Sequence, residues 1–159
     1  MKAGTSAAGR TIVLADQTAT EALGGEIAAT LEQGSVVALK GDLGAGKTTL
    51  ARAILHALGV KEAVPSPTFT LVQTYETPRL TVRHYDFYRI EHEAEIEELG
   101  LEEAIAEGSV LVEWPERAGD LLPGARLDVL LVIADGAREA TLTGPADWLE
   151  RLGKDGDVR

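Results

Sequence analysis

The stretch that decides the fold is Gly41-Asp42-Leu43-Gly44-Ala45-Gly46-Lys47-Thr48. It matches the phosphate-binding pattern G-x-x-x-x-G-K-[ST] at every fixed position. Glycines in this pattern let the backbone turn so that successive N–H groups point at a phosphate, and the N-terminus of the following helix favours negative charge. We therefore expect the backbone of residues 44–46 to cradle phosphates. Lys47 should reach the β- and γ-phosphates of a nucleotide, and the Thr48 hydroxyl should ligate Mg²⁺.

The segments on either side of this loop support the assignment. An apolar run at residues 35–39 is typical of a strand buried on both faces, and residues 49–58 predict a helix that ends before Gly59. Helices alternate with apolar strands along the rest of the chain, which favours an α/β fold. The sequence thus predicts a P-loop NTPase-like three-layer fold with a mostly parallel central sheet and antiparallel strands at its C-terminal side.

Local patterns predict the remaining elements. Capping-box spacing of Thr18 and Glu21 places the start of a helix that Gly34 would end. Residues 69–75 and 80–85 should pair as strands around Pro78. The other expected elements are a strand at 12–14, an acidic helical segment at 93–107 broken near Gly100, a strand at 109–112, a hairpin of 127–134 with 139–143, and a helix at 147–152.

Composition sets limits on the function. The 159 residues are 45 % apolar, include no cysteine and carry a formal net charge of −11. These values predict one globular domain at residues 11–152, between a flexible extension at 1–10 and a flexible tail at 153–159, without disulfides or a membrane span. Because nucleic-acid binding depends on basic patches, the acidic chain is not expected to hold nucleic acid by itself. The polar N-terminus lacks a secretory pattern and suggests a cytoplasmic protein.

A P-loop needs an acidic residue to hold Mg²⁺, and two acids follow strands. Glu113 ends the apolar strand and Asp86 ends a more polar one, and position alone does not separate them. Thr68 lies in a proline-containing loop, where a hydroxyl either senses a γ-phosphate or is simply polar. Trp114 either stacks on a ligand or covers the core. His84 is interpreted as a hydrogen-bonded strand histidine rather than half of a metal pair with Asp86.

Four motifs, in this order, resemble those of the TsaE (YjeE) family of small bacterial P-loop ATPases, and the resemblance covers residues 11–150. They are Gly41-Asp42-Leu43-Gly44-Ala45-Gly46-Lys47-Thr48-Thr49, Ser66-Pro67-Thr68-Phe69-Thr70-Leu71-Val72, His84-Tyr85-Asp86-Phe87-Tyr88-Arg89 and Val112-Glu113-Trp114-Pro115. No catalytic motif position departs from the family pattern. Four ordered motifs are far more specific than the P-loop alone.

The resemblance implies a function that composition does not show. The family acts in making the threonylcarbamoyl modification of adenosine in tRNA, with the TsaB and TsaD proteins as partners. TsaD transfers the threonylcarbamoyl group, and the family member hydrolyses ATP so that the TsaB–TsaD complex can turn over repeatedly. Its own activity is weak without the partners, and tRNA is reached only through them, which agrees with the negative charge.

The resemblance also implies roles for individual residues. Thr48 and Glu113 become the expected Mg²⁺ ligands, and Asp86 becomes a catalytic acid near the metal or the attacking water. Thr68 becomes a switch-like residue near the γ-phosphate, and Trp114 lies near the nucleotide or a partner. The residues expected to bind ATP, with Gln17 and Arg138 near its base or ribose, are Gln17, Gly44, Ala45, Gly46, Lys47, Thr48, Thr49 and Arg138.

Two other functions share the P-loop. A small-molecule kinase also needs an acceptor pocket and usually a basic lid, but the segment after Asp86 is acidic, with only Arg89 nearby. A nucleotide-gated binding module would use ATP binding and would not need hydrolysis. A screen for phosphorylated products tests the first alternative, and a variant that binds but does not hydrolyse ATP tests the second.

Overall fold

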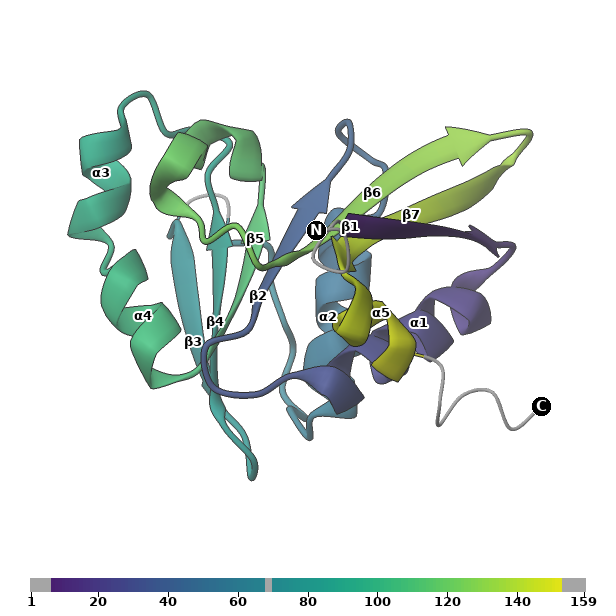
Figure 1. Ribbon diagram of the computed structural model, residues 1–159, viewed down its shortest axis with the longest axis horizontal. Helices are drawn as coiled ribbons and strands as arrows, with labels where there is room; N and C mark the ends of the chain where they lie inside the picture. The colour runs from purple at the N-terminus through teal and green to yellow at the C-terminus, as the bar shows by residue number, and fades with distance from the viewer. Residues whose placement is uncertain (1–6, 68–69, 153–159) are drawn as a thin grey trace.

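The computed structural model describes residues 7–67 and 70–152 as one seven-stranded sheet with helices on both faces (Figure 1). The strands are β1 (Ala7–Leu14), β2 (Val36–Lys40), β3 (Val72–Glu76), β4 (Thr81–Asp86), β5 (Ser109–Glu113), β6 (Leu127–Ala134) and β7 (Ala137–Pro145). The helices are α1 (Gln17–Thr30), α2 (Lys47–Ala57), α3 (Glu93–Glu98), α4 (Leu101–Glu107), the 3-10 helix η2 (Pro115–Leu121) and α5 (Ala146–Arg151).

The sheet has the order β1-β7-β6-β2-β5-β4-β3, and its four middle strands run parallel. The pairs β1–β7, β6–β7 and β3–β4 are antiparallel, so the expected C-terminal hairpin is confirmed and antiparallel strands also form the opposite edge. The central strands lie between two helical layers, and every residue of β5 is buried. Such strands need apolar side chains on both faces, which is why their sequences are continuous apolar runs.

Alternating residues of the central strands feed two apolar cores. One core packs α1, α2 and α5 on the sheet and includes Leu39, Ile54 and Leu111. The other packs α3, α4 and η2 on the opposite face and includes Tyr85 and Ile96. Figure 1 shows the two helical groups on opposite sides of the sheet. This confirms the predicted three-layer α/β architecture and places the loop between β2 and α2 at the carboxyl ends of the parallel strands.

Helix α1 differs from its predicted limits. Its N-cap is Asp16, whose Oδ1 accepts a hydrogen bond from the backbone N–H of Ala19 at 2.9 Å, so the predicted capping box at Thr18 was wrong. The helix ends at Thr30 rather than near Gly34. Gly34, at φ +94°, instead turns the chain towards β2, and its N–H donates to the carbonyl of Gly108 at 2.8 Å. Asp16 and Thr18 are both good capping residues, and the tertiary position of the turn selects between them.

The N-terminal strand begins earlier than the sequence suggested. β1 starts at Ala7 and pairs with β7 from Ala7↔Pro145 to Leu14↔Arg138, so residues 7–10 belong to the sheet and not to an extension. Residues 1–6 and 153–159 lie outside the described part of the chain. Among the residues that the structure describes, no helix has both the length and the apolar character needed to cross a membrane.

Two glycine-dependent turns confirm predictions made from local sequence. Asp135 and Gly136 have φ values of +52° and +79° and join β6 to β7, as the Asp-Gly pair predicts for a tight hairpin. Gly100, at φ +75°, separates α3 from α4 where the acidic helical segment was expected to break. These turns are local, so the sequence alone predicts them well.

The close packing of α1 on α2 leads to a stability prediction. A Cβ added at Gly24 would lie 2.5 Å from the Cβ of Ala53 and 2.9 Å from its backbone carbon, whereas a Cβ at Gly25 would meet nothing within 4 Å. We expect Gly24→Ala to lower the free energy of unfolding by about 1–3 kcal/mol through overpacking. Gly25→Ala should raise it by up to about 1 kcal/mol because alanine favours the helix. Urea unfolding of both variants measures these changes in the free energy of unfolding. Equal changes would contradict the close contact of Gly24 with Ala53.

Candidate functional site

The loop between β2 and α2 has the backbone geometry of a phosphate cradle. Gly41, Gly44 and Gly46 have φ values of +144°, +83° and +109°, which side chains with a Cβ rarely adopt. At Gly41 an added Cβ would also lie 2.6 Å from the carbonyl oxygen of Leu131. Gly46 is the N-cap of α2, so the positive end of this helix faces the loop. The glycines of the motif are therefore required by the turn itself.

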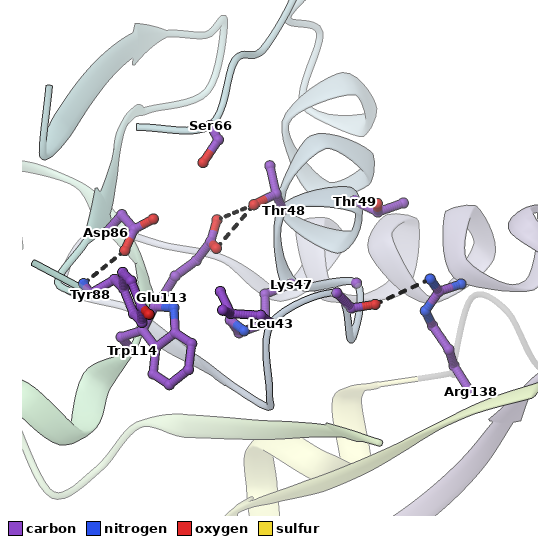
Figure 2. A pocket seen from close by; sticks show the side chains of 12 residues that line it. Leu43, Lys47, Thr48, Thr49, Ser66, Asp86, Tyr88, Glu113, Trp114 and Arg138 are labelled. Atoms are coloured by element: carbon purple, nitrogen blue, oxygen red, sulfur yellow. Dashed lines mark hydrogen bonds between the residues drawn. The ribbon is translucent and has the colours of Figure 1, made fainter. Parts of the chain in front are cut away.

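An open cavity of about 420 Å³ lies over this loop (Figure 2). The sequence-predicted residues that line it are Gly44, Gly46, Lys47, Thr48, Thr49, Asp86, Glu113, Trp114 and Arg138. Three further lining residues were not predicted as site residues: Leu43, Ser66 and Tyr88. The structure thus brings together residues that are far apart in the sequence, such as Arg138 and Gly44, which are 94 positions apart.

Lys47 is buried and its ammonium group is held inside the loop. Its Nζ donates to the carbonyl oxygens of Gly41 and Asp42 at 2.6 and 2.9 Å, and lies 4.3 Å from the centre of the Trp114 ring. Burial lowers the pKa of Lys47 from its ordinary value, while the carboxylates of Glu113 and other nearby acids raise it in part. A charged phosphate would pair directly with this desolvated ammonium, whose hydrogen bonds within the loop go to neutral carbonyls.

Thr48 and Glu113 form the second polar centre of the cavity. The Thr48 hydroxyl lies 3.0 and 2.9 Å from Oε1 and Oε2 of Glu113, whose side chain is almost fully buried (Figure 2). A hydroxyl and a carboxylate at this separation are the hard oxygen donors that Mg²⁺ prefers. The donor set therefore fits the cation that was predicted here. Within residues 7–67 and 70–152, no group of three or more His, Asp or Glu residues could hold a metal by itself.

Asp86 lies next to Glu113 because β4 and β5 are parallel and pair these two residues directly. It is 3 % exposed, and its Oδ1 accepts a hydrogen bond from the backbone N–H of Tyr88 at 2.9 Å. In this arrangement Glu113, and not Asp86, contacts the Thr48 hydroxyl. The register of the two strands thus gives different surroundings to two acids that position at a strand end alone did not separate.

Trp114 forms an aromatic wall of the cavity. Its ring lies 4.9 Å from that of Tyr88, centre to centre, and it also packs against the apolar core under α3 and α4. Its φ of +58° is in the left-handed region, which is unusual for a residue other than glycine. The sequence left a choice between a core role and a role in the site for Trp114, and the structure shows contacts of both kinds.

A second cavity of about 360 Å³ adjoins the first and shares Thr49 and Arg138 with it. Gln17 lines it as well, with its Nε2 donating to Oε2 of Glu21 at 3.3 Å. Arg138 reaches across to the loop, where its Nη2 lies 3.4 Å from the carbonyl oxygen of Gly44. Gln17 and Arg138, far apart in sequence, therefore line one hollow beside the phosphate cradle.

Ala45 and Thr68 are the predicted residues of the loops around the first cavity that do not line it or lie outside the described residues. Ala45 does not line the first cavity: its side chain is buried, and its N–H donates to the carbonyl of Asp42 at 3.0 Å. Thr68 lies outside the described residues, although Ser66, in the same loop, lines the cavity.

The prediction that His84 is a hydrogen-bonded strand histidine is confirmed. It lies in β4, and its Nε2 is 2.7 Å from Oε2 of Glu113. The sequence had not linked this histidine to Glu113. Tyr88 could have been found from the sequence, because it follows Asp86 by two residues in the same motif. For His84 no local signal existed, because its partner is 29 residues away on the next strand.

Comparisons with known proteins show the family of this chain. The family model described as "Threonylcarbamoyl adenosine biosynthesis protein TsaE" matches residues 14–140. Relatives named "tRNA threonylcarbamoyladenosine biosynthesis protein TsaE" include one from Nostoc, 42 % identical with 83 % of this chain and 84 % of the relative covered. Another, from Bacillus subtilis, is 40 % identical with 84 % of each covered. The crystal structure of Bacillus subtilis YdiB has a TM-score of 0.80 at 29 % identity and covers 94 % of this chain and 97 % of that one.

Proposed function

Since this chain belongs to the TsaE family of tRNA threonylcarbamoyladenosine biosynthesis, we propose that it is a magnesium-dependent P-loop ATPase that resets the TsaB–TsaD complex. In this proposal it hydrolyses ATP to ADP and phosphate, and each hydrolysis readies its partners for another round of tRNA modification. The observation that carries the proposal is the contact of the Thr48 hydroxyl with the Glu113 carboxylate, beside a buried Lys47, at the N-terminus of α2.

In this proposal ATP lies across the two adjoining cavities. Its phosphates would lie on the backbone N–H groups of the loop, and its base and ribose would lie in the second cavity near Gln17 and Arg138. Lys47 would exchange the carbonyls of Gly41 and Asp42 for β- and γ-phosphate oxygens. This exchange is favourable because a desolvated ammonium pairs more strongly with a charged phosphate than with neutral carbonyls.

Thr48 and Glu113 would hold Mg²⁺, which supplies charge stabilisation at the phosphate oxygens when it is bound. Asp86 lines the same cavity, its Oδ1 accepts a hydrogen bond from the N–H of Tyr88, and in this proposal its carboxylate would orient the attacking water. Thr68 keeps its proposed place near the γ-phosphate, on the loop that carries Ser66. The Trp114 ring contacts the Lys47 ammonium, and its position would change when the Lys47 side chain moves from the loop carbonyls to the phosphates.

The acidic character of the chain agrees with a division of labour. A net charge of −11 disfavours direct contact with tRNA, so we place the tRNA contacts on TsaB and TsaD. An arginine supplied by a partner would complete the site, and such a residue accelerates phosphoryl transfer by about 10³-fold or more in other systems.

Steady-state ATP hydrolysis by the chain alone and with TsaB and TsaD tests the proposal. We expect low turnover alone and a large rise when both partners are added. Arginine-to-alanine variants of the partners would show whether one of them supplies the missing cation. Equal turnover with and without the partners would contradict the resetting role, while the P-loop assignment would still be decided by the Lys47 variant described below.

A further inference from the structure

His84 is fully buried behind the Glu113 carboxylate. It pairs in register with Leu111 on β5, so its side chain lies on the face of the sheet that α2 covers. The His84 and Glu113 side chains are 0 % and 3 % exposed, and Nε2 lies 2.7 Å from Oε2. His84 does not line the cavity, and it reaches the site only through Glu113.

The hydrogen bond between His84 and Glu113 is assigned from the chemistry of a carboxylate. An ionised carboxylate can only accept, so we assign the proton to Nε2 of His84, which donates to Oε2, while the Thr48 hydroxyl donates to the same carboxylate. The other ring nitrogen, Nδ1, is buried without a hydrogen-bond partner among residues 7–67 and 70–152. A leucine of similar size would fill this place without an unpartnered nitrogen. The polar ring is therefore best explained by what it does to Glu113.

We propose that His84 is a positioning residue that orients the Glu113 carboxylate for Mg²⁺. With Oε2 anchored by His84, Oε1 has more capacity left to face a cation beside the Thr48 hydroxyl. Residues behind a metal ligand fix its orientation in this way, and their loss costs about 10- to 100-fold in metal affinity or activity. This inference rests on the proposed function, because it needs a nucleotide-bound Mg²⁺ at Glu113.

Three substitutions separate positioning from packing. His84→Leu keeps the volume and removes the donor. His84→Gln places an amide N–H at a reach similar to that of Nε2, whereas His84→Asn carries its amide too close to the backbone to replace it. Tyr85→Phe is the matched control: Tyr85 is the next residue of β4, is equally buried, and loses one hydrogen bond, from its hydroxyl to the carbonyl of Leu99 at 3.0 Å on the opposite face.

The measurement is ATP binding by calorimetry, in EDTA and across a Mg²⁺ titration, with thermal unfolding of each variant. We expect His84→Leu and His84→Asn to need about 10- to 100-fold more Mg²⁺ for half-maximal enhancement of ATP binding, with unchanged affinity in EDTA. His84→Gln should recover most of the loss, and Tyr85→Phe should titrate as the wild type does. Steady-state hydrolysis should show the same order of Mg²⁺ requirements.

Several results would overturn the inference. A His84→Leu titration equal to that of the wild type would remove the role, and so would a His84→Gln variant as defective as His84→Leu. Equal losses with and without Mg²⁺ would show a structural role only. If His84→Leu does not fold, the Mg²⁺ titrations of His84→Gln and His84→Asn decide whether the donor at this position matters. A wild-type chain whose ATP binding ignores Mg²⁺ would overturn the proposed function and this inference together, whereas the other outcomes touch the inference alone.

Discussion

Lys47→Ala is expected to lower ATP turnover by about 10²- to 10³-fold, the loss that removal of one preorganised charge-stabilising donor causes. Lys47 is 5 % exposed and lies at the start of α2, with its ammonium within 2.9 Å of two loop carbonyls. The variant loses the positive charge that the γ-phosphate needs as charge develops during transfer. Steady-state hydrolysis at saturating ATP and Mg²⁺ measures the effect, and ATP binding in EDTA measures the loss of affinity.

Lys40→Ala is the matched control for this variant. Lys40 ends β2, just before the loop, but its ammonium pairs with Asp128 at 3.4 Å and it does not line the cavity. Both variants remove one positive charge, so only a specific role of Lys47 separates them. The Lys47→Ala variant should still fold, because a buried ammonium group has a desolvation cost that the variant no longer carries. Turnover equal to that of the wild type would contradict the P-loop assignment.

Glu113→Gln is expected to raise the Mg²⁺ concentration needed for activity and to lower ATP turnover by about 10²-fold or more. The effect should exceed that of the His84 variants, because Glu113 is a proposed Mg²⁺ ligand and His84 only positions it. ATP binding in EDTA should stay the same. Gln keeps the shape of Glu113 and leaves one acceptor for the Thr48 hydroxyl and His84. Glu113→Ala should show the same loss and also lower the free energy of unfolding by about 1–3 kcal/mol, because buried polar groups lose their partner.

Two further variants give the Glu113 result its meaning. Glu107→Ala is the control acid, since its carboxylate pairs with Arg83 at 3.1 Å and is largely exposed. Asp86→Asn tests the other acid of the cavity, which lies opposite Glu113 on the neighbouring strand. An unchanged Mg²⁺ titration for Glu113→Gln, together with a shifted one for Asp86→Asn, would move the metal role to Asp86.

Predictions of the fold succeeded where local sequence is sufficient. The apolar runs of β2 and β5 and the Asp135-Gly136 turn were all found from short patterns. The limits of α1 and β1 were wrong because they depend on distant partners. Residues 7–10 are two alanines, a glycine and an arginine, which do not favour a strand by themselves, and they form one because they pair with the edge of β7, more than 130 positions away. No property of the N-terminal segment itself indicates that edge.

The sequence by itself determined the phosphate cradle, because its glycines, Lys47 and Thr48 all lie within residues 41–48, and the positive φ angles of one backbone turn require the glycines. Its motifs also indicated the family. Only the tertiary structure showed that the Thr48 hydroxyl contacts Glu113, placed His84 behind Glu113, and brought Gln17 and Arg138 to one cavity. The physical reason is that these relations follow from strand register and sheet order. Both are set by packing between segments that are far apart in the chain.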